Sequence, residues 1–232
     1  MLAELTYTFE IIAIFAAFYS TYRILKRKSK LLCSNLMAVG TTFIGLYVLF
    51  VFLYDIIQTL WSIEIFLRMG MFSILTATLF FFYSMNCMVS SSAWFQNKKI
   101  WTPYIIVIIG YTIYLILTPL VEVISATPLN ISISLLPLAI MVVMMLHFLG
   151  ASLSKLFRFG IKKTEGLSQK KMKIFAIGLI LSVISIFINV ASQIFSDSTA
   201  GEILDVVFFF SLACSVVVIA FGFLLEPKNE NE

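Results

Sequence analysis

Long apolar stretches separated by short polar segments follow one another along the whole chain. Seven are long enough to cross a bilayer as helices, since a hydrocarbon core of about 30 Å needs about 20 residues. They cover residues 5–25, 31–55, 63–89, 102–124, 130–154, 173–195 and 202–225. The stretches are too long for barrel strands and lack a two-residue alternation. The pattern therefore predicts seven helices, which satisfy their backbone hydrogen bonds internally.

The composition agrees with a membrane environment for these helices. Hydrophobic residues make up 61% of the 232 residues and charged residues only 12%, whereas about a quarter of the residues in soluble domains are charged. A soluble core of this size would leave a large apolar surface in water. We therefore predict an all-α integral membrane protein, in which residues 1–232 form one seven-transmembrane-helix bundle with a short tail at 226–232.

The charged residues between the spans predict the orientation of the chain. Fifteen of the 16 Lys and Arg residues lie after the first, third and fifth spans or in the tail, and Arg68 is the exception. Basic loops face the cytoplasm, so we expect the N-terminus outside the cell membrane and the C-terminus inside. The first ten residues, MLAELTYTFE, are acidic, and cations follow the first span, which is typical of a span that is not cleaved. The basic loops match no nucleic-acid-binding fold. The orientation rule accounts for them, and contact with the anionic lipid of the bilayer is the alternative.

A weak internal repeat relates the second and third spans to the sixth and seventh. An offset of 138 residues pairs Ala38 with Ala176, Gly40 with Gly178, Glu64 with Glu202, Ile65 with Ile203, Phe72 with Phe210 and Ser73 with Ser211. Chance matches occur in apolar segments, so two interpretations stay open. Either a three-span unit is duplicated on both sides of the fourth span, or the matches are coincidental.

Two prolines fall inside predicted spans. Pro119 and Pro137 lie in the outer parts of the fourth and fifth spans, where a kink would free backbone carbonyls. Broken helices around a midplane site are typical of transporters, but two prolines near the outer ends are a weaker indication.

The sixth span carries its polar residues on one helical face. This face holds Ser182, Ser185, Asn189, Ser192 and Gln193. Such a face either forms hydrogen bonds between helices or lines a cavity. Because most ionisable groups within the spans lie in the outer halves, we expect any cavity to open outward.

Arg68 is the only cation predicted on the outer side of the membrane, and that side holds eight of the twelve acids. Its neighbour Glu64 is four residues away, which allows a helical ion pair. Glu10, Glu122 and Asp205 are the other expected partners, and Glu10 is an acid within a span. Arg68 is therefore either a side chain that reaches the outer interface or a counter-ion among several helices.

The sequence carries no recognisable catalytic or cofactor motif. Hydrolase, nucleotide-binding and metalloprotease signatures are absent, and His147 is the only histidine. The three cysteines have no metal-ligand spacing, so no metal site is predicted. A retinal pigment would need a lysine in the last span, and EILDVVFFFSLACSVVVIAFGFLLE has none.

The middle of the chain resembles a known membrane module. LYDIIQTLWSIEIFLRMGMFSILTATLFFFYSMN, followed by a basic turn and WTPYIIVIIGYTIYLILTP, is similar in texture to the seven-helix sensor modules that precede prokaryotic histidine kinases. The resemblance covers spans two to four. It implies a sensor whose output passes to a separate partner, because the kinase part is absent.

Three functional hypotheses follow. The first is a non-enzymatic sensor or receptor-like module, in which a ligand entering from outside changes the helix packing that a cytoplasmic or membrane signalling partner reads. The second is a small transporter or channel for a cation or small solute, and the third is a structural subunit of a membrane complex. The predicted ligand-binding residues are Arg68, Glu64, Glu10, Glu122, Asn189, Gln193 and Asp205.

Overall fold

The computed structural model describes residues 2–26, 31–57, 59–90, 97–126, 129–195 and 198–224, with only the backbone described between 122 and 132. Its helices are α1 (Leu2–Leu25), α2 (Leu32–Ile56), α3 (Leu60–Ser90), α5 (Lys98–Leu117), α6 (Leu135–Lys155), α7 (Gly166–Ile194) and α8 (Thr199–Leu224), and a π-helical segment η1 (Leu156–Ile161) extends α6. Within the described part of the chain, seven helices are long and apolar enough to cross a membrane. The prediction of a multi-span helical protein is confirmed at that level.

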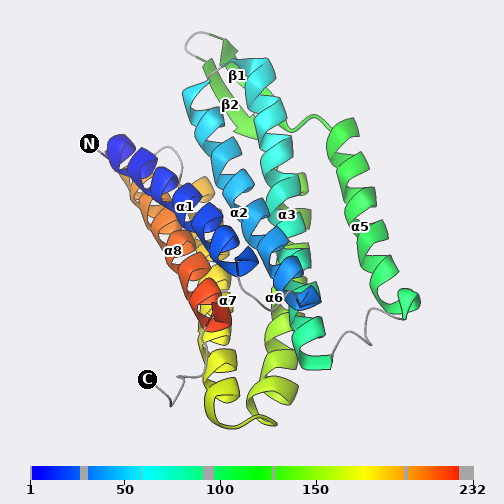
Figure 1. Ribbon diagram of the computed structural model, residues 1–232. Helices are drawn as coiled ribbons and strands as arrows, with labels where there is room; N and C mark the ends of the chain where they lie inside the picture. The colour runs from blue at the N-terminus through cyan, green and yellow to red at the C-terminus, as the bar shows by residue number, and fades with distance from the viewer. Residues whose placement is uncertain are drawn as a thin grey trace.

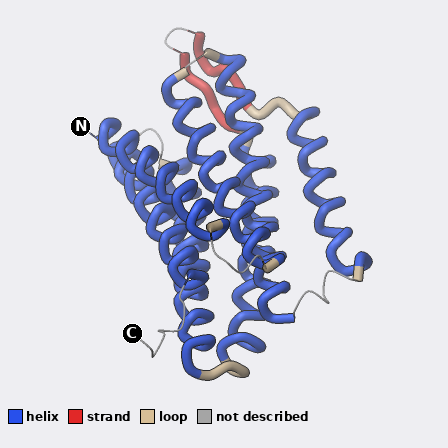
Figure 2. The backbone as a smooth tube through the Cα atoms, viewed as in Figure 1, coloured by secondary structure: helices blue, strands red, loops and turns tan. Residues whose placement is uncertain are grey.

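A short β-hairpin interrupts the predicted fourth and fifth spans. Strands β1 (Val121–Ala126) and β2 (Leu129–Ile133) pair antiparallel at one end of the bundle (Figure 2). The predicted span 102–124 was wrong at its end, because α5 stops at Leu117. Thr118 is extended, as favoured for a residue before proline, and the β-branched residues after Pro119 suit a strand.

The two prolines do not kink spans as predicted. Pro119 lies beyond the end of α5 and therefore bends no helix. Pro137 lies in the first turn of α6, where the backbone amide has no helical partner and proline is tolerated.

Six helices form a closed ring. In order around the ring, α1, α2, α3, α6, α7 and α8 each pack against the next, and α8 packs against α1 again. Figure 1 shows α1 beside α8 and α2 beside α3, while α5 stands outside the ring on the far side of α3. The hairpin lies where α2 and α5 end and where α3 and α6 begin. We call this the hairpin end of the bundle.

The closest helix pairs repeat the sequence offset of 138 residues. A Cβ atom at Gly40 would stand 2.6 Å from the ring of Phe81, and one at Gly178 would stand 2.5 Å from Cγ1 of Ile219. The offset that pairs Gly40 with Gly178 also pairs Phe81 with Ile219. The α2–α3 pair and the α7–α8 pair therefore meet through equivalent positions. Since α1 and α6 also both begin at the hairpin end, the structure favours duplication over coincidence.

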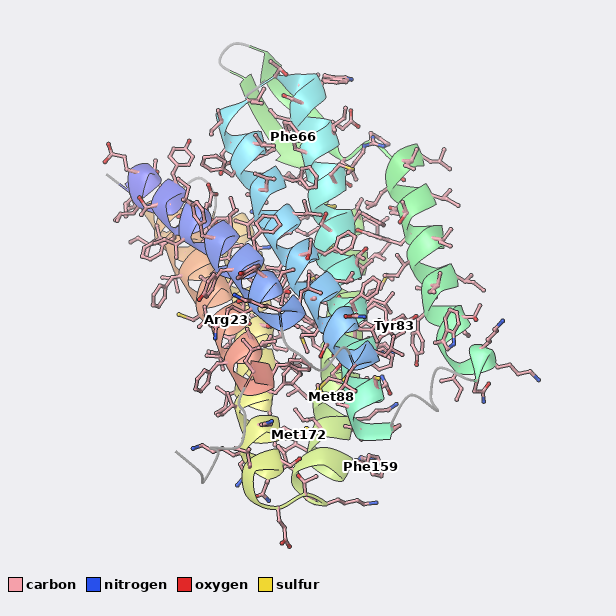
Figure 3. All side chains as sticks on the ribbon, viewed as in Figure 1. Arg23, Phe66, Tyr83, Met88, Phe159 and Met172 are labelled. Carbon is pink, nitrogen blue, oxygen red and sulfur yellow. The ribbon has the colours of Figure 1, made fainter. Side chains whose placement is uncertain are left out.

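Polar bonds connect α5 to the ring. The Tyr111 hydroxyl donates to the Pro137 carbonyl of α6 at 2.9 Å, and the Tyr83 hydroxyl of α3 donates to the Trp101 carbonyl at 2.9 Å. Figure 3 places Tyr83 on the side of α3 that faces α5. The opposite face of α5 exposes Ile106, Ile113 and other large apolar residues, which suits contact with lipid rather than water.

Candidate functional site

A cavity lies between the helices at the hairpin end of the ring. It holds about 1070 Å³ of space, including its open mouth, and is lined by all six ring helices and by β2. Its polar wall includes Thr6, Tyr54, Asp55, Asn189, Gln193 and Asp205. We call it the hairpin-end cavity.

A second cavity lies deeper in the bundle. It holds about 520 Å³ and is lined mostly by apolar residues, with Ser182 and Ser185 among its polar ones. We call it the central cavity. Tyr47, Met141, Asn189 and Phe208 line both cavities. The two spaces therefore adjoin each other, one nearer the hairpin end and one nearer the middle of the bundle.

The polar face of α7 serves both of the roles considered for it. Ser185 forms a hydrogen bond with Ser211 of α8 at 2.7 Å, and the Ser215 hydroxyl donates to the Gly178 carbonyl at 3.1 Å. These bonds join α7 to α8. Asn189 and Gln193, one and two turns farther along, line the hairpin-end cavity instead.

The cavity walls repeat the 138-residue offset. Eight wall positions in the first half have an equivalent that also lines one of the two cavities. The pairs are Ile44 with Ser182, Tyr47 with Ser185, Val51 with Asn189, Asp55 with Gln193, Leu67 with Asp205, Gly70 with Phe208, Met71 with Phe209 and Ile74 with Leu212. The cavities therefore lie between two equivalent halves, α1–α3 and α6–α8.

Three acids from three helices come together beside the hairpin-end cavity. Asp55 of α2 and Asp205 of α8 line it. Glu10 of α1 is fully buried, and its carboxyl lies against that of Asp55. Asp55 and, more weakly, Asp205 act electrostatically on Glu10. Tyr47 lies within electrostatic reach of all three acids, so the three carboxyl groups gather on one side of the cavity.

Arg68 lies away from this acidic group. Its guanidinium donates to the carbonyls of Leu115 at 2.7 Å and Ile116 at 2.6 Å at the end of α5, and more weakly to Thr118 at 3.2 Å. It also pairs with Glu64, as the spacing predicted. Arg68 is therefore a side chain that binds the carbonyl end of α5, where the helix dipole is negative.

The structure brings together only some of the predicted ligand-binding residues. Asn189, Gln193 and Asp205 share the hairpin-end cavity. Glu10 as a partner of Arg68 was wrong, because Arg68 pairs with Glu64 and Glu10 interacts with Asp55 instead, and the Glu122 side chain lies outside the described residues. Sequence reasoning missed Asp55 as a site residue. Its position at the very end of an apolar span was the available signal, but that position is also typical of a solvated helix end.

The only histidine of the sequence packs against aromatic rings. His147 of α6 lies beside the rings of Tyr104 and Phe148, with centroids 6.5 and 5.8 Å away. Among the described residues, no group of three or more His, Cys, Asp or Glu side chains is arranged to hold a metal ion.

No protein-family model matches the chain, and no curated protein or solved structure shows significant similarity to it. Its function is therefore inferred from its own residues.

Proposed function

We propose that this chain is a multi-pass protein of the cell membrane with its hairpin end facing outward. The start of α5 and the connection between α6 and α7, which both carry lysines, lie at the opposite end (Figure 1). Lysine-rich connections stay in the cytoplasm. The hairpin-end cavity would then open to the outside, with the N-terminus outside and the C-terminus inside.

We infer that the protein carries a small solute across the membrane. The observation that carries this proposal is the position of the two cavities between equivalent halves of the chain. Transporters built from repeats bind their substrate at the repeat interface and expose it to each side in turn. The tightly packed pairs α2–α3 and α7–α8 are the elements that would move relative to each other around the site.

A contact at the end opposite the hairpin suits an inner gate in this proposal. Lys155 at the end of α6 donates to the side chain of Asn86 on α3, and its Nζ lies 5.7 Å from the centre of the Phe82 ring. This contact joins helices of different halves below the central cavity. In a transport cycle it would break as the inner side opens.

Flux through proteoliposomes tests the proposal. Purified protein would be reconstituted and exposed to a panel of small amines, amino acids, sugars and inorganic ions, with uptake followed by electrometry or radiolabel. Asn189→Trp, which fills the boundary between the two cavities, should abolish the flux found. Phe187→Trp on the exposed face of the same helix should leave it unchanged. Absence of flux for the whole panel, or equal flux in both variants, would contradict transport.

A non-enzymatic sensor module is the second candidate. The observation in its favour is α5, which stands outside the ring and is tied to α3 by Arg68 beside the hairpin end. A ligand that alters the mouth of the cavity could shift α5, and a cytoplasmic or membrane partner could read that shift. Saturable binding without flux in the same proteoliposomes would favour the sensor over the transporter.

A further inference from the structure

We propose that the hairpin-end cavity binds an organic cation, with Asp55 and Asp205 as its direct charge partners and the buried carboxyl of Glu10 behind them. This proposal deepens the proposed function and rests on it in one respect, namely that the cavity is a solute site. The class of ligand is an ammonium or guanidinium compound of small-molecule size.

The carboxyl groups gathered beside the cavity are the first reason. Glu10 is fully buried, and Asp55 and Asp205 act on its carboxyl electrostatically. Burying carboxyl groups together is costly unless a partner offsets their repulsion, and ionisable groups within membrane spans usually mark sites of function. Arg68, the cation that the sequence places on this side, is already bound to Glu64 and to the end of α5. A cation bound in the cavity would offset the repulsion among these acids.

The walls of the cavity indicate an organic rather than a metallic cation. No three acids in the described part of the chain are close enough together to hold one metal ion, so the three carboxyls suit a larger occupant. Aromatic rings, including those of Tyr47, Tyr54, Phe66 and Phe208, line the same space. Ring faces attract organic ammonium groups, and recognition of quaternary ammonium by aromatic cages uses this effect.

Two amides of α7 add hydrogen-bonding groups to the site. Asn189 and Gln193 of α7 line the cavity, and their side chains both donate and accept hydrogen bonds. A ligand with a cationic end toward Asp55 and a polar or aromatic remainder toward α7 would use both sets of groups.

Matched cationic and neutral probes test the proposal. The cations are tetramethylammonium, phenethylammonium and phenyltrimethylammonium, and tert-butylbenzene is the neutral isostere of the last. Binding to the purified full chain would be followed by calorimetry and by the shift in thermal unfolding. We expect at least one cation to bind and the neutral isostere to give no shift. Asp55→Asn and Asp205→Asn should each weaken binding about tenfold, as loss of one charge partner predicts.

Two control variants separate site effects from folding. Glu202→Gln removes an exposed acid one turn from Asp205 on the same helix, which acts on Asp205 only electrostatically, and should change cation affinity much less than Asp205→Asn does. Asp205→Glu keeps the charge and should retain most of the affinity. If none of the cations binds, if the neutral isostere binds equally well, or if Glu202→Gln weakens binding as much as Asp205→Asn, the proposal is wrong.

The outcomes also separate this proposal from the proposed function. Flux of neutral solutes without binding of any cation would overturn the cation site and leave transport in place. Cation binding that depends on Asp55 and Asp205, without flux of any solute, would overturn transport and leave the cation site in place.

Discussion

Replacing Arg68 with glutamine removes the main polar connection between α3 and the end of α5. The guanidinium reaches the carbonyls of Leu115 and Ile116 at 2.7 and 2.6 Å. These carbonyls belong to the last turn of α5, which has no further helical turn to satisfy them. Because α5 stands outside the ring, its end depends on this contact more than a ring helix would. We expect Arg68→Gln to loosen the end of α5 without unfolding the bundle.

The size of the effect follows from the bonds that are lost. A hydrogen bond involving a charged group is worth about 1.5–3 kcal/mol when both partners are shielded from water. Ile116 and Leu117 are exposed, so water can replace part of each lost bond. We therefore assign about 1 kcal/mol to each of the two short bonds, or about 2 kcal/mol together, which is about a 30-fold increase in local opening.

Hydrogen exchange in lipid nanodiscs measures this opening directly. Amides in the last turn of α5, including that of Thr118, which bonds to the Tyr114 carbonyl at 3.0 Å, should exchange about 30-fold faster in Arg68→Gln. Glu64→Gln removes only the helical ion pair and should change exchange little. If these amides exchange at the same rate in Arg68→Gln, the hydrogen bonds from Arg68 do not hold the end of α5, and the reasoning is refuted.

Two further substitutions test the packing of the ring and of α5. Gly178→Ala should lower the unfolding free energy by about 1–3 kcal/mol, because the added Cβ would stand 2.5 Å from a side chain of α8. Gly150→Ala is the control: its Cβ would meet no atom within 4 Å, and thermal unfolding should be unchanged. Tyr111→Phe should cost about 1 kcal/mol through the lost bond to the Pro137 carbonyl, with Tyr114→Phe as the matched control. Equal effects within either pair would count against the contacts assigned here.

The helices could be predicted from the sequence because they are encoded locally, whereas the duplication was only one of two interpretations of a sequence offset. Apolar runs of about 20 residues identify spans without knowledge of their neighbours. The pairing of Gly40 with Gly178 was visible as an offset, and the contacts with Phe81 and Ile219 then gave it a structural meaning. Asn189 and Gln193 were placed on one helical face by their spacing, which also depends only on local geometry.

The partners of the charged side chains could not be predicted in the same way. Arg68 binds carbonyls some 50 residues away, and backbone carbonyls leave no signal in a sequence. Asp55 joins Glu10 and Asp205 only because α1 packs against both α2 and α8. The hairpin was missed because the strand-forming residues after Pro119 are also apolar enough to extend a span. Each of these features depends on which helices are neighbours, a property of the whole bundle.

The two halves place different chemistry at equivalent positions of the cavity wall. Asp55 corresponds to Gln193, and Asp205 corresponds to Leu67, so each half contributes one acid at a non-equivalent position. Both acids come from helices that flank α1, which carries Glu10. The double variant Asp55→Gln, Gln193→Asp moves one acid to the equivalent wall position and keeps the net charge. We expect it to recover part of the cation affinity lost in Asp55→Gln alone, measured by calorimetry, because the carboxylate still faces the same cavity. Full recovery would mean that distance from Glu10 is unimportant, and no recovery would show that the two wall positions are not equivalent for the ligand.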